Sequence, residues 1–189
     1  IVFNVQFNLL KLIDLGISHQ LNPENFGLEV SPKLEGTLAY LSPEQTGRIT
    51  QALDHRTDFY ALGVTFFELL TGQLPFISND PMELVYWHLV KQPPWFRDRT
   101  DRQIPEGLEA IVRKLMAKNV DDRFQSIWGL KADLEHAQSL WQSQGQVQIF
   151  ALGEQDIPDR LQIPQMLYGR EAELEVLGTL WDHVSQTAE

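Results

Sequence analysis

The organisation of the chain follows from one apolar segment, DHRTDFYALGVTFFELLTG, at residues 54–72. It predicts a helix from about residue 56 to residue 70, ended by Gly72, because glycine readily adopts the left-handed conformation that closes many helices. Unpaired buried carboxylates are costly, so Asp58 and Glu68 on this helix are each expected to have a partner. Apolar side chains on nearly every side predict burial on most sides; they are Phe59, Tyr60, Leu62, Val64, Phe66, Phe67, Leu69 and Leu70.

The composition indicates a folded, soluble protein. Of the 189 residues, 43% are hydrophobic and 22% are charged, which is typical of globular domains rather than disordered chains. The formal net charge of −11 argues against nucleic acid or an anionic membrane as a partner. Absence of cysteine excludes disulfides and thiol chemistry, and the histidines lack the spacing of a metal site. No apolar run long enough for a membrane helix and no signal peptide is visible, so we expect a cytoplasmic protein.

Short apolar runs precede the central helix. Those at residues 1–3 and 9–13 predict a small β-hairpin. The second run leads into DLG at residues 14–16, where an acid follows a strand; taken alone, this tripeptide fits a structural turn equally well. Residues 17–35 show neither helical nor strand periodicity and predict a long loop.

Further amphipathic helices follow the central one. Residues 78–92 predict a helix with Asp80 as N-cap and Pro81 in its first turn. Residues 105–117 predict the next helix, and Ser126 is expected to cap another that carries apolar side chains at helical spacing. Beyond it, periodicity is lost and proline and glycine return, which predicts a linker.

The order of four motifs resembles the C-terminal lobe of a eukaryotic-type protein kinase. The resemblance covers roughly residues 1–141 and implies a mainly α fold: a kinase-like C-lobe with a small β-hairpin at its N-terminus, followed by a linker and a terminal helix. The motifs are DLG at residues 14–16, GTLAYLSPE at 36–44, D-x-x-x-LG-x-x-x-x-ELLTG-x-x-PF at 58–76, and DDRF at 121–124.

The resemblance implies catalytic roles within a predicted activation segment, residues 14–44. Asp14 corresponds to the aspartate that binds Mg²⁺ on ATP, and Gly16 belongs to the same cofactor-binding motif. Thr37 corresponds to the threonine that hydrogen-bonds the catalytic loop, and the motif around it favours serine or threonine over tyrosine as the phosphate acceptor. Ser31, which precedes Pro32, is a candidate regulatory phosphorylation site.

Other residues are implied to support this site structurally. Glu44 and Arg123 correspond to a buried, bidentate ion pair that anchors the activation segment, a geometry suited to arginine. Asp58 corresponds to the helix acid that holds the backbone of the catalytic loop. Leu15 and Ser42 depart mildly from the family pattern.

The largest departure is what the sequence lacks. No Gly-rich phosphate loop, ATP-contacting lysine or H-R-D catalytic loop occurs in the chain, so the N-lobe and catalytic loop are expected upstream and the chain alone is expected to be inactive. The implied function is ATP-dependent phosphoryl transfer to serine or threonine of proteins in signal transduction, with Mg²⁺. A pseudokinase or docking module coupled to an ATPase is the alternative; Asp14 favours the enzyme, because a docking module has no need of it.

The C-terminal sequence LYGREAELEVL, residues 167–177, resembles the opening of ATPase modules of the signal-transduction type. No G-x-x-x-x-GK[ST] motif is present, so the phosphate loop of such a module would follow residue 189. The alternative is an ordinary surface helix. We expect attached ATPase and signalling domains, as in large multidomain bacterial signalling kinases. The expected organisation is a kinase C-lobe at 1–143, a linker at 144–164 and the start of an ATPase-type module at 165–189.

Overall fold

The computed structural model describes residues 2–4, 6–7, 9–11, 38–49, 51 and 53–157. Near the N-terminus, β1 (Val2–Asn4) pairs antiparallel with β2 (Leu9–Lys11), which confirms the predicted hairpin. The predicted loop at 17–35 and the predicted terminal helix lie outside the described residues. The longer helices, which confirm a mainly α fold, are α1 (Arg56–Thr71), α2 (Pro81–Val90), α3 (Glu106–Leu115) and α4 (Ile127–Gln144). None of these described helices is long and apolar enough to cross a membrane.

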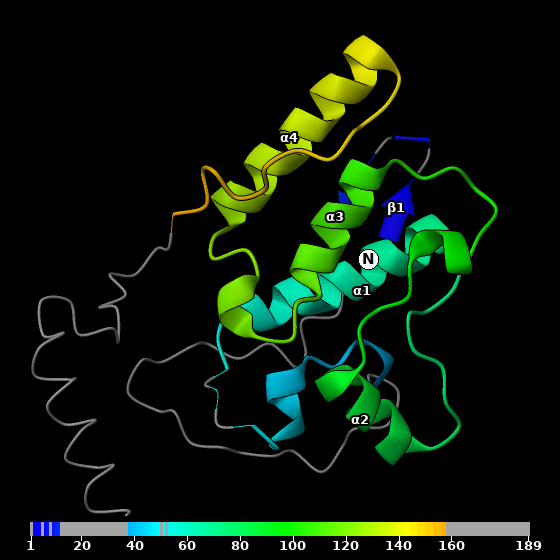
Figure 1. Ribbon diagram of the computed structural model, residues 1–189, viewed down its shortest axis with the longest axis vertical. Coiled ribbons are helices and arrows are strands. Elements are labelled where there is room, and N and C mark those ends of the chain that lie inside the picture. The colour runs from blue at the N-terminus through cyan, green and yellow to red at the C-terminus, as the bar shows by residue number, and fades with distance from the viewer. Residues whose placement is uncertain are drawn as a thin grey trace, which may run out of the picture. The chain divides into compact units, whose positions relative to one another are not determined.

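Helix α1 packs across α3 (Figure 1). Its side chains contribute to both apolar clusters of the described residues. Tyr60 and Phe67 are buried in a cluster shared with α2 and α3, whereas Phe59 belongs to a cluster shared with α3 and α4. Helix α3 lies close against α1 because residue 63 is glycine: a Cβ there would come within 2.8 Å of Leu115 Cβ. A larger residue at this position would push the two helices apart.

Helix α1 is buried or half-buried on most sides, as predicted, and only a narrow face of it is exposed within the described residues. Leu69 is 68% exposed and Asp58 is exposed as well. These residues lie on the side of the helix opposite Tyr60 and Phe67. Apolar side chains on nearly every side of the helix do not specify which face this is.

Helix α2 begins as predicted. The side chain of Asp80 accepts a hydrogen bond from the backbone N–H of Met82 at 2.8 Å, and Pro81 occupies the first turn. This helix packs against two short 3₁₀ helices, η1 (Leu38–Tyr40) and η2 (Pro43–Thr46). The segment of residues 38–46 is therefore held against α1 and α2.

Residues 145–157, here called the C-terminal strap, run back along α4 (Figure 1). Val147 is buried and its carbonyl accepts from the N–H of Gly107 at 3.0 Å. At the far end, the Asp156 carboxylate accepts from the N–H and hydroxyl of Ser126, the residue that caps α4. Ser126 was predicted as this cap and is confirmed. The first part of the predicted linker is thus packed chain, held by the carbonyl of Val147, the N–H of Gly153 and the carboxylate of Asp156.

Candidate functional site

The most deeply buried charges of the described chain form one ion pair. Glu44 lies in η2 and Arg123 follows the 3₁₀ helix η4 (Val120–Asp122), 79 residues away in sequence. Arg123 Nη1 donates to Glu44 Oε1 at 2.7 Å and Nη2 donates to Oε2 at 2.8 Å. Both side chains have 0% exposure. This parallel double contact is the geometry in which arginine binds a carboxylate most strongly.

Every N–H of the Arg123 guanidinium has an acceptor. Besides Glu44, Nε donates to the carbonyl of Ala117 at 2.7 Å, Nη1 to that of Arg56 at 3.0 Å and Nη2 to that of Lys118 at 3.3 Å. A buried charge is tolerated when its hydrogen-bonding capacity is met in this way. Lysine could not replace arginine here, because an ammonium is a point donor without the planar fork.

The carboxylate of Glu44 is similarly well matched. The hydroxyl of Thr57, at the start of α1, donates to Glu44 Oε1 at 2.9 Å. Burial alone would raise the pKa of Glu44, but the hydrogen bonds and charge of Arg123, together with Thr57, outweigh it and hold the pKa below its ordinary value. The pair is therefore ionised at neutral pH and ties η2 to α1 and to the turn before α4.

The segment around Glu44 is fixed at further points. The Tyr40 hydroxyl donates to Glu68 Oε2 at 2.6 Å, so Glu68 has the partner expected of it. This hydrogen bond, with burial and the Glu68 charge, raises the pKa of Tyr40 to about 12. Ser42 is fully buried and its backbone N–H donates to the Gln45 side chain at 3.0 Å. Residues 38–46 are thus anchored along their length.

A second buried polar group lies beside the ion pair. Lys118 Nζ donates to the Tyr60 hydroxyl at 3.0 Å, and that hydroxyl lies 3.0 Å from Nδ1 of His88, which is fully buried. Burial and the charge of Lys118 lower the pKa of His88 to about 4, although the backbone of Ala39 and Leu38 acts in the opposite direction. Burial, and to a lesser extent Arg123, lowers the pKa of Lys118 to about 7.

The strap reaches the surroundings of the ion pair through Gln125. Asp156 Oδ2 accepts from the backbone N–H of Gln125 at 2.7 Å, and the Gln125 side-chain oxygen accepts from Arg56 Nη1 at 2.7 Å. Arg56 also pairs with Asp54 and Asp121, at 2.8 and 2.9 Å. The start of α1, the start of α4 and the end of the strap therefore meet at one polar junction.

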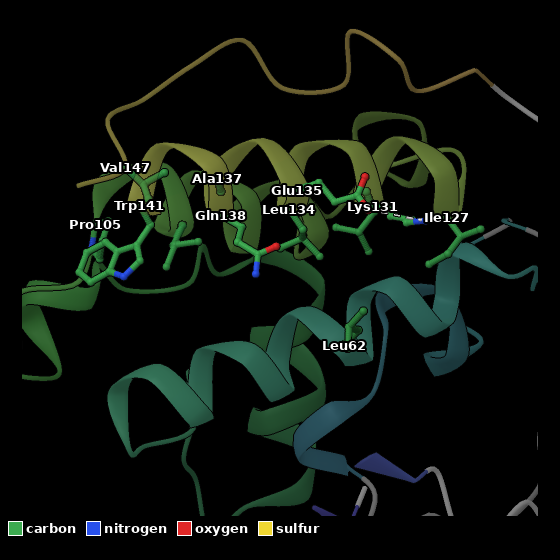
Figure 2. A pocket seen from close by; sticks show the side chains of 12 residues that line it. Leu62, Pro105, Ile127, Lys131, Leu134, Glu135, Ala137, Gln138, Trp141 and Val147 are labelled. Carbon is green, nitrogen blue, oxygen red and sulfur yellow. Dashed lines mark ion pairs between the residues drawn. The ribbon is translucent and has the colours of Figure 1, made fainter. Parts of the chain in front are cut away.

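An apolar groove of about 740 Å³ lies between α1, α3 and α4. Figure 2 shows Ile127, Leu134 and Trp141 of α4 projecting into the space facing Leu62 of α1. A triphosphate needs cations or clustered N–H donors, whereas the basic residue at this groove, Lys131, is paired with Glu135 at 3.6 Å. The groove does not fit a nucleotide.

Comparison with known proteins identifies the family to which the sequence belongs. A sequence model of the family described as the protein kinase domain matches residues 1–137. The chain belongs to this family. The kinase motifs at residues 36–44, 58–76 and 121–124 thus fall within the matched part, and the segment fixed by Glu44 and Arg123 is part of a kinase domain.

Relatives come from signalling kinases. The chain is 41% identical over 170 residues to hybrid signal transduction histidine kinase G of Dictyostelium discoideum, covering 79% of this chain and 5% of that protein. It is 37% identical over 127 residues to serine/threonine-protein kinase PknB of Mycolicibacterium smegmatis, covering 67% of this chain and 20% of that kinase. It is also 37% identical over 131 residues to serine/threonine-protein kinase pkn3 of Myxococcus xanthus, covering 24% of it. The chain spans a quarter or less of each of these relatives.

Several predicted kinase residues lie outside the described part of the chain. Asp14, Gly16, Ser31 and Thr37 are among these, so their roles remain predictions. Within the described residues, no group of histidine, aspartate and glutamate side chains could hold a metal ion. The Mg²⁺ site therefore depends on the assignment of Asp14.

The structure brings Glu44 and Arg123 together in the geometry expected from the resemblance; their role in anchoring an activation segment stays a prediction. Asp58 is exposed within the described residues, and its expected partner, the backbone of the catalytic loop, is not among them, so its role stays a prediction. The position of Asp58 on α1 explains its exposure, since Thr57 and Phe59 face inward and Asp58 faces outward.

Sequence reasoning missed Thr57, the Lys118–Tyr60–His88 group and Asp156. A signal was available for Tyr60, because a tyrosine inside an apolar helix needs a partner for its hydroxyl. No comparable signal marks Asp156, whose partners are backbone N–H groups and one hydroxyl.

Proposed function

We propose that the protein is a serine/threonine protein kinase that transfers phosphate from ATP to serine or threonine of proteins in signal transduction, and that this chain is its C-terminal lobe. The observation that carries the proposal is the buried bidentate pair of Glu44 and Arg123. It fixes residues 38–44, the described part of the GTLAYLSPE motif, to the helical core. The serine/threonine specificity is supported by that motif and by the similarity to kinases of that class.

In this proposal Asp14 holds Mg²⁺ on the phosphates of ATP, and Gly16 lets the backbone approach the same site. Thr37 positions the catalytic loop, and residues 38–41 receive the substrate peptide. Mg²⁺ supplies charge neutralisation for the transferring phosphoryl group, for which a hard carboxylate oxygen is the suitable ligand. Ser31 is the proposed phosphorylation site of the activation segment.

The proposed partners are the protein substrate and attached signalling modules. The net charge of −11 supports neither nucleic acid nor an anionic membrane as a partner. The tail motif at residues 167–177 supports an ATPase-type module after the kinase lobe, and the match to a hybrid signal transduction kinase fits a multidomain setting. We propose a cytoplasmic location for the protein.

The test is phosphoryl transfer by the intact gene product that contains this chain. Labelled ATP with Mg²⁺ and a generic serine/threonine substrate protein should give labelled phosphoserine or phosphothreonine. The 189-residue chain alone should give none, because the positioning parts of a kinase site are absent from it. Absence of transfer by the intact protein, with a nucleotide still bound, would instead favour the pseudokinase alternative.

A further inference from the structure

We propose that the C-terminal strap is a latch on the anchor of residues 38–46. Its residue Asp156 holds the turn that presents Arg123 to Glu44, so that packing of the strap and formation of the buried ion pair stabilise each other. The latch consists of contacts among the described residues and does not require phosphoryl transfer. It therefore goes beyond the proposed function and stands or falls separately from it.

One carboxylate fixes the turn between Arg123 and α4. Asp156 Oδ2 accepts from the backbone N–H of Gln125 at 2.7 Å. Asp156 Oδ1 accepts from the N–H and the hydroxyl of Ser126, at 2.8 and 2.9 Å. Both N–H groups belong to the residues that follow Arg123 closely in sequence. Hydrogen bonds to an ionised acceptor are the stronger kind, so Asp156 holds the backbone conformation of residues 125–126.

The strap comes very close to α4 at this point. A Cβ on Gly129 would lie 2.6 Å from the Cα of Asp156, so only glycine allows this approach. The strap is also held at Gly153, whose N–H donates to Asp133 Oδ2 at 2.8 Å, and at the buried Val147. Of these contacts, the one at Asp156 adjoins the turn that carries the guanidinium of the ion pair.

The side chain of Gln125 continues the contact from the strap to the ion pair. Its Nε2 donates to the carbonyls of Val120 and Arg123, at 2.9 and 2.8 Å. Its Oε1 accepts from Arg56 Nη1 at 2.7 Å. The carbonyl of Arg56 in turn accepts from Arg123 Nη1 at 3.0 Å, and the same nitrogen donates to Glu44 Oε1. The strap, the start of α1 and the buried guanidinium thus share one continuous hydrogen-bond network.

The burial of the pair makes this network sensitive to the position of the turn. Arg123 and Glu44 have 0% exposure, so a guanidinium that is displaced from its acceptors cannot be solvated by water instead. Hydrogen bonds also weaken steeply as their angles depart from linearity. Release of Asp156 should therefore weaken the ion pair, and loss of the pair should weaken the strap by the same factor, because coupling between sites is reciprocal. A partner that draws the strap off α4 would loosen residues 38–46.

The first test is a double-mutant cycle in the 189-residue chain, measured by urea unfolding. Asp156→Ala removes the acceptor on the strap, and Glu44→Gln removes the negative charge of the anchor. Asp156→Ala should change the unfolding equilibrium constant at least about fivefold less in the Glu44→Gln background than in wild type. Glu154→Ala, at an exposed acid of the same strap, should show no such coupling. Thr57→Val, which removes one hydrogen bond to Glu44, takes the place of Glu44→Gln if that variant does not fold.

Hydrogen exchange gives a second readout, which the loss of a helix cap alone would not change. The N–H of Gln45 donates to the carbonyl of Ser42 at 3.1 Å. Asp156→Ala should raise its exchange rate at least about fivefold relative to amides in the middle of α1. Ser126→Ala should not, because it removes the cap of α4 while both N–H groups can still bond to Asp156. Additive effects in the cycle, or equal acceleration of all amides, would overturn the latch and leave Asp156 only a support of α4.

Discussion

Replacement of Glu44 by glutamine tests the central contact of the described fold. The substitution keeps the size and one acceptor oxygen but turns the other oxygen into a donor that faces Arg123 Nη2. The guanidinium would then be a buried cation without a counter-charge, at a site with 0% exposure. The contact at 2.8 Å between Nη2 and Oε2 would become repulsive.

The expected cost follows from this burial. Removing one partner of a buried pair costs about 3–5 kcal/mol, because the remaining charge stays uncompensated. A domain of ordinary stability has roughly 5–15 kcal/mol in total, so Glu44→Gln should remove a large fraction of its free energy of unfolding. Glu135→Gln is the matched control: it breaks the Lys131–Glu135 pair, whose side chains are 57% and 64% exposed, and should cost less than about 0.5 kcal/mol.

Urea unfolding followed by tryptophan fluorescence measures both variants in the whole chain. In the double variant Glu44→Met with Arg123→Met, stability should partly recover relative to either single change, because no buried charge remains. Recovery should be incomplete, since the carbonyls of Ala117, Arg56 and Lys118 lose their donor. A coupling energy of at least about 2 kcal/mol is expected. Equal, small losses for Glu44→Gln and Glu135→Gln would refute the reasoning.

The pH dependence gives an independent check on Glu44. Its pKa is lower in the folded than in the unfolded state, so its stabilisation is present above the unfolded value and disappears as pH falls through the folded one. The difference in stability between wild type and Glu44→Gln should therefore shrink below about pH 4.5, the ordinary value.

Three further outcomes are expected. Asp14→Ala in the intact protein should abolish phosphoryl transfer while circular dichroism stays unchanged, with Asp101→Ala as the matched control; unchanged turnover would remove Asp14 from the metal site. Gly129→Ala should lower the melting temperature by several degrees, because its Cβ would come within 2.6 Å of Asp156 backbone; a melting temperature equal to that of wild type would show that the strap is not packed there. Because folding lowers the pKa of His88 to about 4, the unfolded state binds a proton at a higher pH than the folded state does. The free energy of unfolding should therefore fall by on the order of 1 kcal/mol for each unit by which the pH is lowered from 6.5 to 4. NMR of the folded protein should show no protonation of the ring in that interval, and a midpoint near pH 6.5 would contradict the burial argument.

The helices were predictable because local chemistry marks them. Asp80 and Ser126 cap their helices through their own side chains, and such signals lie within a few residues of the contacts they predict. The pairing of Glu44 with Arg123 came only from resemblance, because no local pattern links residues 79 positions apart.

What could not be predicted depends on tertiary packing. The outward orientation of Asp58 reflects which face of α1 its neighbours cover, and an apolar pattern on all sides cannot specify that. Glycine and proline usually mark loops and so predict a linker at the strap, yet Val147 and Asp156 hold it through contacts with α3 and α4. The buried group at His88 combines residues from separate elements, none of which is unusual in its own sequence.

The separation of 79 residues between Glu44 and Arg123 has a kinetic consequence. Contacts between distant residues require a long loop to close, so they form after the local contacts that stabilise the helices. Arg123 can receive Glu44 only when the turn before α4 has its final shape, since three backbone carbonyls share the same guanidinium. Residues 38–46 therefore complete folding last.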